Sequence, residues 1–353
     1  MRRDKEKIIV FGTGSYMKSK LDVLKEKYNI VKFSDNNKEN WGKIIENVNV
    51  IDPCEILEYN FDYIVIASMY WFEIGKQLIE MGIENKKILL LQNFTPYSNE
   101  EELFFKTGKE KFFIDESGDA CYTNGINIIS INSVDDYYII KEIWGETVYD
   151  FFHYCNNEEK YVVFDIGMNI AAATLYFAER NNVKNVFSFE PFKKTFEQAI
   201  HNIEKNIEIK QKIKPFNYGL SNKNDIVDVF FDNSKKSAMS TLIEVNVKGK
   251  FNNCSKDKVN VKNAADVIKK IMNEEKSIVK YVLKMDCEGE EYNIFDTLKK
   301  NDIIGKFDII MLEWHYKGSE MLEEVLKERG FSYFKFIRDK DTGLIYAIKN
   351  KYR

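Results

Sequence analysis

The chain has 353 residues, of which 44% are hydrophobic and 31% are charged, and its 52 basic and 56 acidic residues give a net charge of −4. This length fits two domains, and the balanced charge gives no electrostatic footprint for nucleic acid or an anionic membrane. The sequence contains no apolar run near the roughly 20 residues that span a bilayer, and its five cysteines include no C-x-x-C pair. We therefore expect a cytoplasmic protein with no disulfide framework, no nucleic-acid partner and no stable membrane insertion.

The first 97 residues alternate strand and helix signals. Strands are expected at 7–11, 30–34, 48–51, 61–67 and 87–91, and helices at 16–27, 53–57 and 72–81. Strand–helix alternation with short turns implies a parallel sheet covered on both faces. Residues 1–97 are therefore predicted to form a small Rossmann-like domain.

The ligand of this first domain is left open. Gly12 and Gly14 satisfy half of a dinucleotide fingerprint, but Met17 stands where the third glycine belongs. Asp35 follows the next strand and is well placed for a ribose. A docking or oligomerising scaffold is the favoured interpretation, with nucleotide or nucleotide-sugar binding as the alternative.

Residues 98–158 are predicted to be a linker and lead-in region. Its start, 98–102, is acidic and polar, and 112–131 has the turn residues of irregular strands. Residues 134–155 have aromatic and aliphatic side chains at helical spacing, which indicates a helix with its apolar face packed on the next domain.

A second strand–helix alternation fills residues 159–353. Its strands are expected at 161–164, 185–189, 213–217, 227–231, 281–285 and 307–312. The last two, 333–337 and 344–348, flank a segment with hairpin turn chemistry. A parallel sheet that closes with an antiparallel hairpin is typical of the class I methyltransferase Rossmann-like fold. The fold class is therefore α/β in both halves of the chain.

Acidic residues end three apolar strands of this second half, at Asp165, Glu190 and Asp286. Ligands of open parallel sheets bind at the carboxyl ends of the strands. Gly167 is expected where a cofactor packs against bare backbone, Asp165 can bond its ammonium group, and Glu190 can hold both ribose hydroxyls. The pattern indicates an adenosine-bearing cofactor and favours S-adenosylmethionine over NAD.

The ends of two later strands carry the residues suited to the reaction. Asp286 should lie near the transferring group and the acceptor, and Lys284 should share a sheet face with it. Lys284 either keeps that carboxylate ionised or forms a partly buried structural pair. Strand alternation points Glu313 and His315 to the same side, and histidine is well suited to accept a proton near neutral pH.

Five motifs in order resemble the FkbM family of S-adenosylmethionine-dependent methyltransferases. They are D-I-G-x-N at 165–169, F-E-P at 189–191, G-L-S at 219–221 after Asn217, K-x-D-x-E-G-x-E at 284–291 and E-x-H at 313–315. The resemblance implies a class I fold, S-adenosylmethionine as cofactor, and methylation of hydroxyl groups on sugars and natural products.

The resemblance also implies the site residues. The cofactor would be held by Asp165, Gly167, Asn169, Glu190, Asn217 and Asp286, and catalysis would rest on His315, Glu313 and Asp286. The chain departs from the family at Ala171, where a second glycine is usual, and at 263–266, which lacks the usual Leu-Asp pair. Residues 237–240 correspond to a serine-containing loop bordering the acceptor site.

These observations predict an enzyme that modifies glycans by O-methylation, with His315 taking the hydroxyl proton and no metal ion required. The acceptor would be a small molecule or a glycan-linked group, and a homo-oligomer is possible. Alternatives are N-methylation of a glycan-linked amine, a divalent cation held by Asp286, Glu288 and Glu313, an NAD-dependent sugar-modifying oxidoreductase, and an inactive scaffold.

Overall fold

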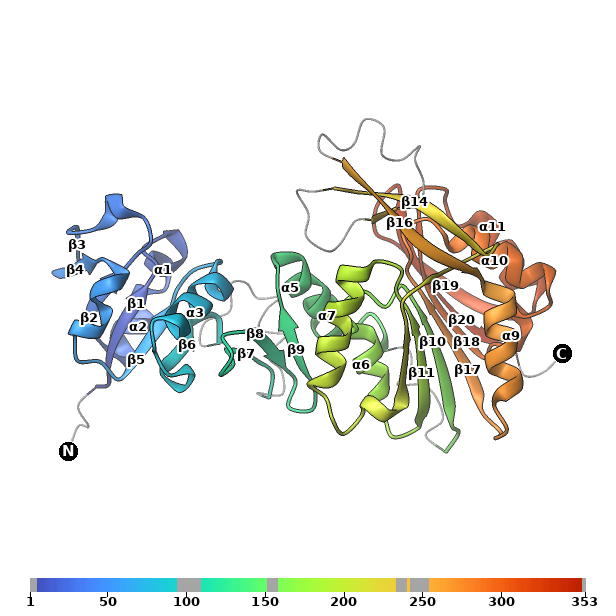
Figure 1. Ribbon diagram of the computed structural model, residues 1–353, viewed down its shortest axis with the longest axis horizontal. Helices are drawn as coiled ribbons and strands as arrows, with labels where there is room; N and C mark the ends of the chain where they lie inside the picture. The colour runs from blue at the N-terminus through green and yellow to red at the C-terminus, as the bar shows by residue number, and fades with distance from the viewer. Residues whose placement is uncertain (1–4, 94–108, 151–157, 233–239, 242–253, 351–353) are drawn as a thin grey trace. The chain divides into compact units, whose positions relative to one another are not determined.

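The computed structural model divides into two compact units, residues 1–132 and 133–353. It describes residues 5–93, 109–150, 158–232, 240–241 and 254–350 (Figure 1). The boundary falls inside the predicted lead-in region 98–158, so that its strands belong to the first unit and its helix to the second. Among the described residues, no helix combines the length and apolar character needed to cross a membrane.

A six-stranded sheet forms the centre of the first unit, in the order β3-β4-β2-β1-β5-β6. Its strands are β1 Lys7–Phe11, β2 Asn29–Ser34, β3 Ile44–Ile45, β4 Val48–Ile51, β5 Tyr63–Ile66 and β6 Ile88–Leu90. All neighbours are parallel except β3 and β4. The sheet therefore has the strand order of a doubly wound α/β unit.

The helices of the first unit largely follow the sequence pattern. They are α1 Ser15–Ser19, α2 Leu21–Lys27, α3 Trp71–Glu80 and the short 3₁₀ helices η1 Lys38–Asn40, η2 Pro53–Glu58, η3 Asn85–Lys87 and η4 Leu91–Asn93. The single helix expected at 16–27 is interrupted at Lys20, which leaves helical geometry at ψ 7°. Pro53 begins η2 as expected for a first helical position, and Asp52 caps it by accepting from the Cys54 N–H.

A three-stranded antiparallel sheet completes the first unit, with strands β7 Lys111–Ile114, β8 Ala120–Thr123 and β9 Ile128–Ile131. It packs against α3. The rings of Trp71 and Phe112 lie 5.6 Å apart, and a side chain at Gly75 would collide with Ile114. This packing attaches the strands expected in the lead-in region to the first unit.

The second unit is built on a seven-stranded sheet in the order β12-β11-β10-β17-β18-β20-β19. Its strands are β10 Tyr161–Ile166, β11 Val183–Phe189, β12 Ile213–Phe216, β17 Lys280–Met285, β18 Ile309–His315, β19 Phe331–Ile337 and β20 Thr342–Lys349. Only β20 runs antiparallel to its neighbours. The predicted parallel sheet with a closing antiparallel hairpin is confirmed.

Helices cover both faces of this sheet (Figure 1). They are α5 Val134–Ile140 with the π-helical turn η5 Lys141–Gly145, α6 Ala172–Ala178, α7 Lys193–Glu204, α9 Ala264–Glu274, α10 Glu291–Lys300, α11 Glu320–Glu328, and the 3₁₀ helices η7 Lys210–Lys212 and η8 Ile304–Lys306. The central strands β10 and β17 are almost wholly buried, as near-continuous apolar strands of a doubly covered sheet should be. The order in which the chain adds strands to the sheet reverses between β10 and β17. In an open parallel sheet, a crevice lies at the carboxyl ends of the two strands at such a point.

A smaller sheet lies beside this core in the order β13-β16-β14-β15. Its strands are β13 Gly219–Ser221, β14 Asp225–Asp232, β15 Ser240–Thr241 and β16 Cys254–Asn263. The strand expected at 227–231 is therefore not a member of the main sheet. It pairs with β16, because Val229 on one strand and Val259 and Val261 on the other bury a shared apolar face.

Candidate active site

A cavity of about 320 Å³ opens at the carboxyl ends of β10, β11, β17 and β18 in the second unit. Its size lies within the range of small-molecule sites, and its position is the expected one for a ligand of an open parallel sheet. Of the residues predicted for the site, Gly167, Asn169, Glu190, Asp286, Glu313 and His315 line it. Asp165 and Asn217 are not among its lining residues.

Gly167 turns the chain from β10 toward α6 with a φ of +82°, a conformation that favours glycine. A Cβ atom here would lie 1.8 Å from the backbone oxygen of Asp286. The glycine is therefore required by contact between the two loops that follow β10 and β17. The sequence-based reason for this glycine was the close approach of a cofactor. The contact with Asp286 excludes a larger residue even before a cofactor is bound.

Asp165 and Lys284 form a buried ion pair under this glycine turn, with 3.1 Å between the Lys284 ammonium and the carboxylate. The same ammonium donates to the carbonyl oxygen of Gly167 at 2.7 Å, and Thr174 donates to the other oxygen of Asp165 at 2.5 Å. Asp165 is fully buried and supports the turn through these contacts, and its predicted contact with the cofactor stays a prediction. Of the two readings of Lys284, the structure supports the structural pair, with Asp165 as its partner.

Glu190 ends β11 and joins two segments of the cavity wall. Its carboxylate accepts from the backbone N–H groups of Asn169 at 3.0 Å and Phe192 at 2.9 Å. Burial raises the pKa of Glu190 to about 7, although these two hydrogen bonds oppose the rise. Asn217 donates to the Glu190 carbonyl oxygen at 2.9 Å, so it positions the end of the strand from outside the cavity.

Asn169 lines the cavity and carries a polar side-chain atom that the chain itself leaves without a partner. Its side-chain oxygen is buried and has no hydrogen-bond partner within the described part of the chain. Its backbone has a φ of +51°, and its N–H is already bonded to Glu190. A buried acceptor of this kind is costly unless a ligand donates to it.

Ala171, the departure from the usual second glycine, has a left-handed conformation with φ 69° at the start of α6. A non-glycine residue pays roughly 1–2 kcal/mol in this region. Ala171 is fully buried and does not line the cavity. The substitution therefore acts on the conformation of the turn and leaves the cavity wall unchanged.

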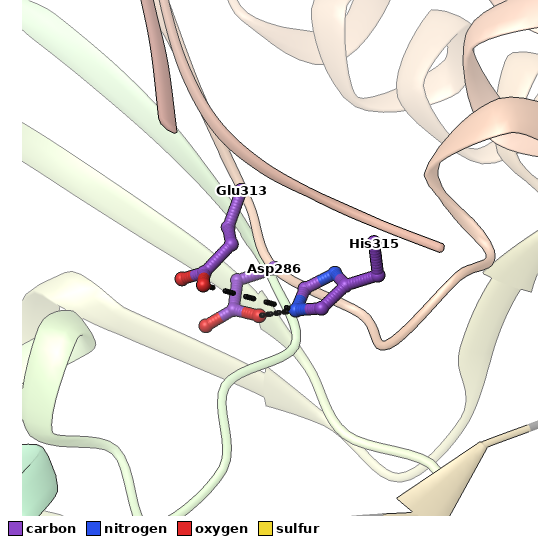
Figure 2. A group of neighbouring side chains, drawn as sticks. All are labelled: Asp286, Glu313 and His315. Carbon is purple, nitrogen blue, oxygen red and sulfur yellow. Dashed lines mark ion pairs between the residues drawn. The ribbon is translucent and has the colours of Figure 1, made fainter. Parts of the chain in front are cut away.

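Three polar side chains from two adjacent strands converge on the other side of the cavity (Figure 2). Asp286 follows β17, and Glu313 and His315 lie on β18. The His315 Nε2 atom is 3.9 Å from an oxygen of Asp286 and 3.9 Å from an oxygen of Glu313. The expected alternation, with Glu313 and His315 on one side, brings these groups together as predicted.

The other ring nitrogen of His315, Nδ1, is bonded to the buried carboxylate of Glu291. Burial lowers the pKa of His315, but the hydrogen bond and charge of Glu291, together with the charges of Asp286 and Glu288, outweigh it and raise the pKa to about 10. The imidazole is therefore protonated at neutral pH in the ligand-free site. This is opposite to the neutral state that a proton acceptor needs.

Burial and the charge of Asp286 raise the pKa of Glu313 to about 8. Burial likewise raises the pKa of Glu288 to about 7. Glu288 has a φ of +53°, lines the cavity, and accepts a hydrogen bond from the Tyr316 hydroxyl at 3.3 Å. The cluster is thus rich in carboxylates crowded around one imidazole.

Sequence reasoning did not assign Glu142 and Arg338 to this site. Glu142 lies in the π-helical turn η5 and Arg338 follows β19, yet the two are hydrogen bonded and both line the cavity. Arg338 also lies 3.3 Å from Glu313. No local pattern connects these distant segments, although Arg338 begins the segment in which the sequence indicated hairpin turn chemistry. The serine loop expected at 237–240 lies mostly outside the described residues.

In the first unit, Asp35 bonds to its own chain. Its carboxylate accepts from the Thr13 N–H at 2.9 Å, the Thr13 hydroxyl and the Asn37 N–H at 2.8 Å. Met17, at the position of the third glycine, is fully buried in the core. Both residues therefore have structural partners where a dinucleotide would need a ribose acceptor and an open turn.

The sequence matches two family models. Residues 165–333 match the methyltransferase FkbM domain, and residues 4–89 match the family described as C2185-like, N-terminal. No curated protein matches the chain.

Several solved structures are similar to it. The methyltransferase FkbM from Methylobacillus flagellatus KT is 12% identical, with 97% of this chain and 90% of that chain covered and a TM-score of 0.37. TrmK of M. capricolum, solved with S-adenosyl-homocysteine, is 14% identical, with 58% and 68% covered and a TM-score of 0.35. Magnesium protoporphyrin IX methyltransferase from Synechocystis PCC 6803, solved with bound SAM, is 10% identical, with 63% and 86% covered and a TM-score of 0.37.

Proposed function

We propose that this protein moves a methyl group from S-adenosylmethionine to a hydroxyl group of a sugar or glycan, because residues 165–333 match the methyltransferase FkbM domain. One observation carries the proposal. A single cavity joins the turn of Gly167, Asn169 and Glu190 to the cluster of Asp286, Glu313 and His315. A donor held by the turn would direct its reactive end toward the cluster.

The residues around the glycine turn fit this cofactor. The unpaired side-chain oxygen of Asn169 can accept from the ammonium of the methionine part, and each Glu190 oxygen keeps a lone pair for a ribose hydroxyl. When bound, the cofactor supplies an electrophilic methyl group on a sulfonium. Lys284 acts from beneath the turn, because its ammonium donates to the carbonyl of Gly167 and is held in place by Asp165.

The acceptor side of the cavity favours a ligand with several hydrogen-bond donors. Asp286, Glu288 and Glu313 offer carboxylate oxygens to the same space. Their oxygens accept hydrogen bonds from the hydroxyl groups of a sugar, and a carboxylate that is ionised accepts more strongly. The same negative charge would also suit an amine, which keeps N-methylation as the alternative acceptor chemistry.

With the cofactor bound, an acceptor oxygen placed beside Asp286 and Glu288 would take the methyl group, so that a C–O bond would form as the C–S bond breaks and the electron pair stays on sulfur. The hydroxyl proton passes to a carboxylate, for which we assign Glu288 in place of His315. Glu288 lies in the cavity wall, 3.9 Å from the His315 Nε2 atom. His315 then acts as a fixed neighbour that orients the carboxylates. Positioning of donor and acceptor supplies most of the rate, and the base adds about 10²–10⁴-fold.

Calorimetry with S-adenosylhomocysteine tests the cofactor half of the proposal on the full chain. Glu190→Ala removes a charged acceptor and should weaken binding by about 1.5–3 kcal/mol, which is roughly 10- to 160-fold. The matched control is Glu197→Ala, because Glu197 is an exposed carboxylate in α7, the helix that follows Glu190 in the chain. Unchanged affinity in Glu190→Ala, or no binding by the natural protein, would contradict the proposal.

Release of S-adenosylhomocysteine in the presence of nucleotide sugars, glycans and amino sugars tests the acceptor half. Glu288→Gln should lower turnover with a hydroxyl acceptor by about 10²–10⁴-fold and leave S-adenosylhomocysteine affinity unchanged. Glu324→Gln, an exposed carboxylate of α11, is the control. Methyl transfer to amines alone would establish the N-methylation alternative.

A further inference from the structure

Asp286, Glu313 and His315 have the spacing of ligands to one metal ion. One donor atom from each of the three lies within 4.8 Å of the other two. Figure 2 shows the His315 Nε2 atom facing both carboxylates. The three residues come from the ends of adjacent strands, so the sheet itself holds them in place.

The distances within this triad are too long for hydrogen bonds and suit shared coordination. The Nε2 atom lies 3.9 Å from each carboxylate oxygen, beyond the limit of about 3.2 Å for a good hydrogen bond. Two ligands placed about 2.1 Å from one octahedral ion lie about 3.0 Å apart when adjacent and about 4.2 Å apart when opposite. The observed 3.9 Å is about 0.9 Å longer than the adjacent separation, so the side chains would draw together on binding one ion.

His315 is oriented as metal-bound histidines are. It is only 5% exposed, and its Nδ1 atom is bonded to Glu291, which is fully buried. Histidine ligands almost always donate their other N–H group to a carboxylate, a backbone carbonyl or water, which fixes the tautomer and raises the basicity of the ligating nitrogen. Glu291 thus holds the ring with Nε2 directed toward the two carboxylates, and loss of the Nε2 proton on metal binding would free its lone pair for the ion.

The charge of the cluster also calls for a cation. Asp286, Glu288 and Glu313 surround Nε2, and Glu291 adds a fourth carboxylate behind the ring. Within the described chain, Arg338 contacts Glu313 but also Glu142. Glu291 is buried and the other three carboxylates are partly exposed, and carboxylates withdrawn from water in excess of their counter-charges are costly unless they bind a metal.

We propose that Asp286, Glu313 and the Nε2 atom of His315 bind a divalent cation of the Mn²⁺ or Mg²⁺ class. Two carboxylates and one imidazole leave open coordination positions toward the cavity. If the proposed methyl transfer is correct, on which this part rests, the ion would bind the acceptor oxygen and lower the pKa of its hydroxyl group. The inference replaces the sequence-based expectation that no metal is needed.

Titration of the full chain with Mn²⁺, followed by EPR, tests the site without any assay of turnover. The natural protein should bind one Mn²⁺, and His315→Ala should weaken that binding at least about 10-fold. Glu291→Gln, which changes only the residue that positions the ring, should weaken it by about 10- to 100-fold. The control is Asp135→Asn, because Asp135 lines the same cavity outside the triad. This substitution removes one carboxylate charge, as Glu291→Gln does.

Electron spin-echo modulation from an imidazole nitrogen is a second readout. It is measured on the Mn²⁺-loaded natural protein, so it does not require any substituted protein to fold. Its presence supports the site. Absence of Mn²⁺ binding both with and without S-adenosylhomocysteine, absence of nitrogen coupling, or equal losses in Asp135→Asn and His315→Ala would overturn it. If the metal site is overturned but S-adenosylhomocysteine still binds normally, the proposed methyl transfer stands. If Mn²⁺ binds but S-adenosylhomocysteine does not, the methyl transfer is refuted and the metal site stands.

Discussion

Replacing Gly167 by alanine separates two explanations for this glycine. If the glycine serves only the approach of the cofactor, Gly167→Ala should weaken S-adenosylhomocysteine binding and leave the ligand-free protein as stable as before. The structure predicts a loss of stability without ligand, because the new Cβ would lie 1.8 Å from the backbone oxygen of Asp286. Neither loop can relieve this contact by a side-chain rotation.

The expected loss has two parts. The left-handed backbone at φ +82° costs an alanine about 1–2 kcal/mol, and forcing an extra carbon into a packed contact costs about 1–3 kcal/mol more. The sum, about 2–5 kcal/mol, corresponds to a fall of about 4–20 °C in the transition temperature of a unit of this size. S-adenosylhomocysteine binding should weaken as well, since the turn carries Asn169 and its bond to Glu190.

Differential scanning calorimetry of the full chain measures this, and the transition that moves on adding S-adenosylhomocysteine identifies the second unit. Gly330→Ala is the matched control. Gly330 has a similar φ of +72°, but the nearest atom to an added Cβ is the flexible Lys349 ammonium at 3.9 Å. It should therefore show only the backbone cost of about 1–2 kcal/mol. Equal effects in the two variants, or a stable ligand-free Gly167→Ala protein, would refute the loop-contact explanation.

Three further predictions concern buried or bonded carboxylates. Lys284→Met leaves the Asp165 carboxylate without its counter-charge and should reduce the unfolding free energy measured by calorimetry by about 3–5 kcal/mol. Adding Asp165→Asn should recover part of this loss, and the absence of any recovery would argue against the ion pair. Glu190 has a pKa of about 7 against its usual 4.5, so the folded unit keeps a proton that the unfolded chain releases, and its contribution to stability falls as pH rises through this window. The transition temperature of Glu190→Ala should consequently decline less steeply across that window, and parallel profiles would contradict the assignment. Asp35→Ala removes the acceptor for Thr13 and should destabilise the first unit by about 1–3 kcal/mol without changing S-adenosylhomocysteine affinity, whereas a change in affinity alone would point to a ligand role.

The main architecture of the second unit follows from local sequence pattern. Apolar runs that stop at Asp165, Glu190 and Asp286 mark strand ends, because burial on both faces requires continuous apolar side chains and the sheet edge permits a charge. The closing hairpin follows from its turn residues. The smaller sheet was misjudged. Its strands β13, β15 and β16 were missed, and the strand at 227–231 was placed with the main sheet, since a sheet partner is chosen by long-range packing.

The tertiary structure decided what each charged residue does. Lys284 forms its ion pair with Asp165 and not with Asp286. Glu142 forms an ion pair with Arg338, which is 196 residues away in the sequence. These choices depend on which strand ends lie side by side, which is set by the crossover between β10 and β17. Periodicity and turn chemistry describe neighbours along the chain, so they place acids at one edge of a sheet, but only the packed strand order determines which of them are neutralised and which face the cavity.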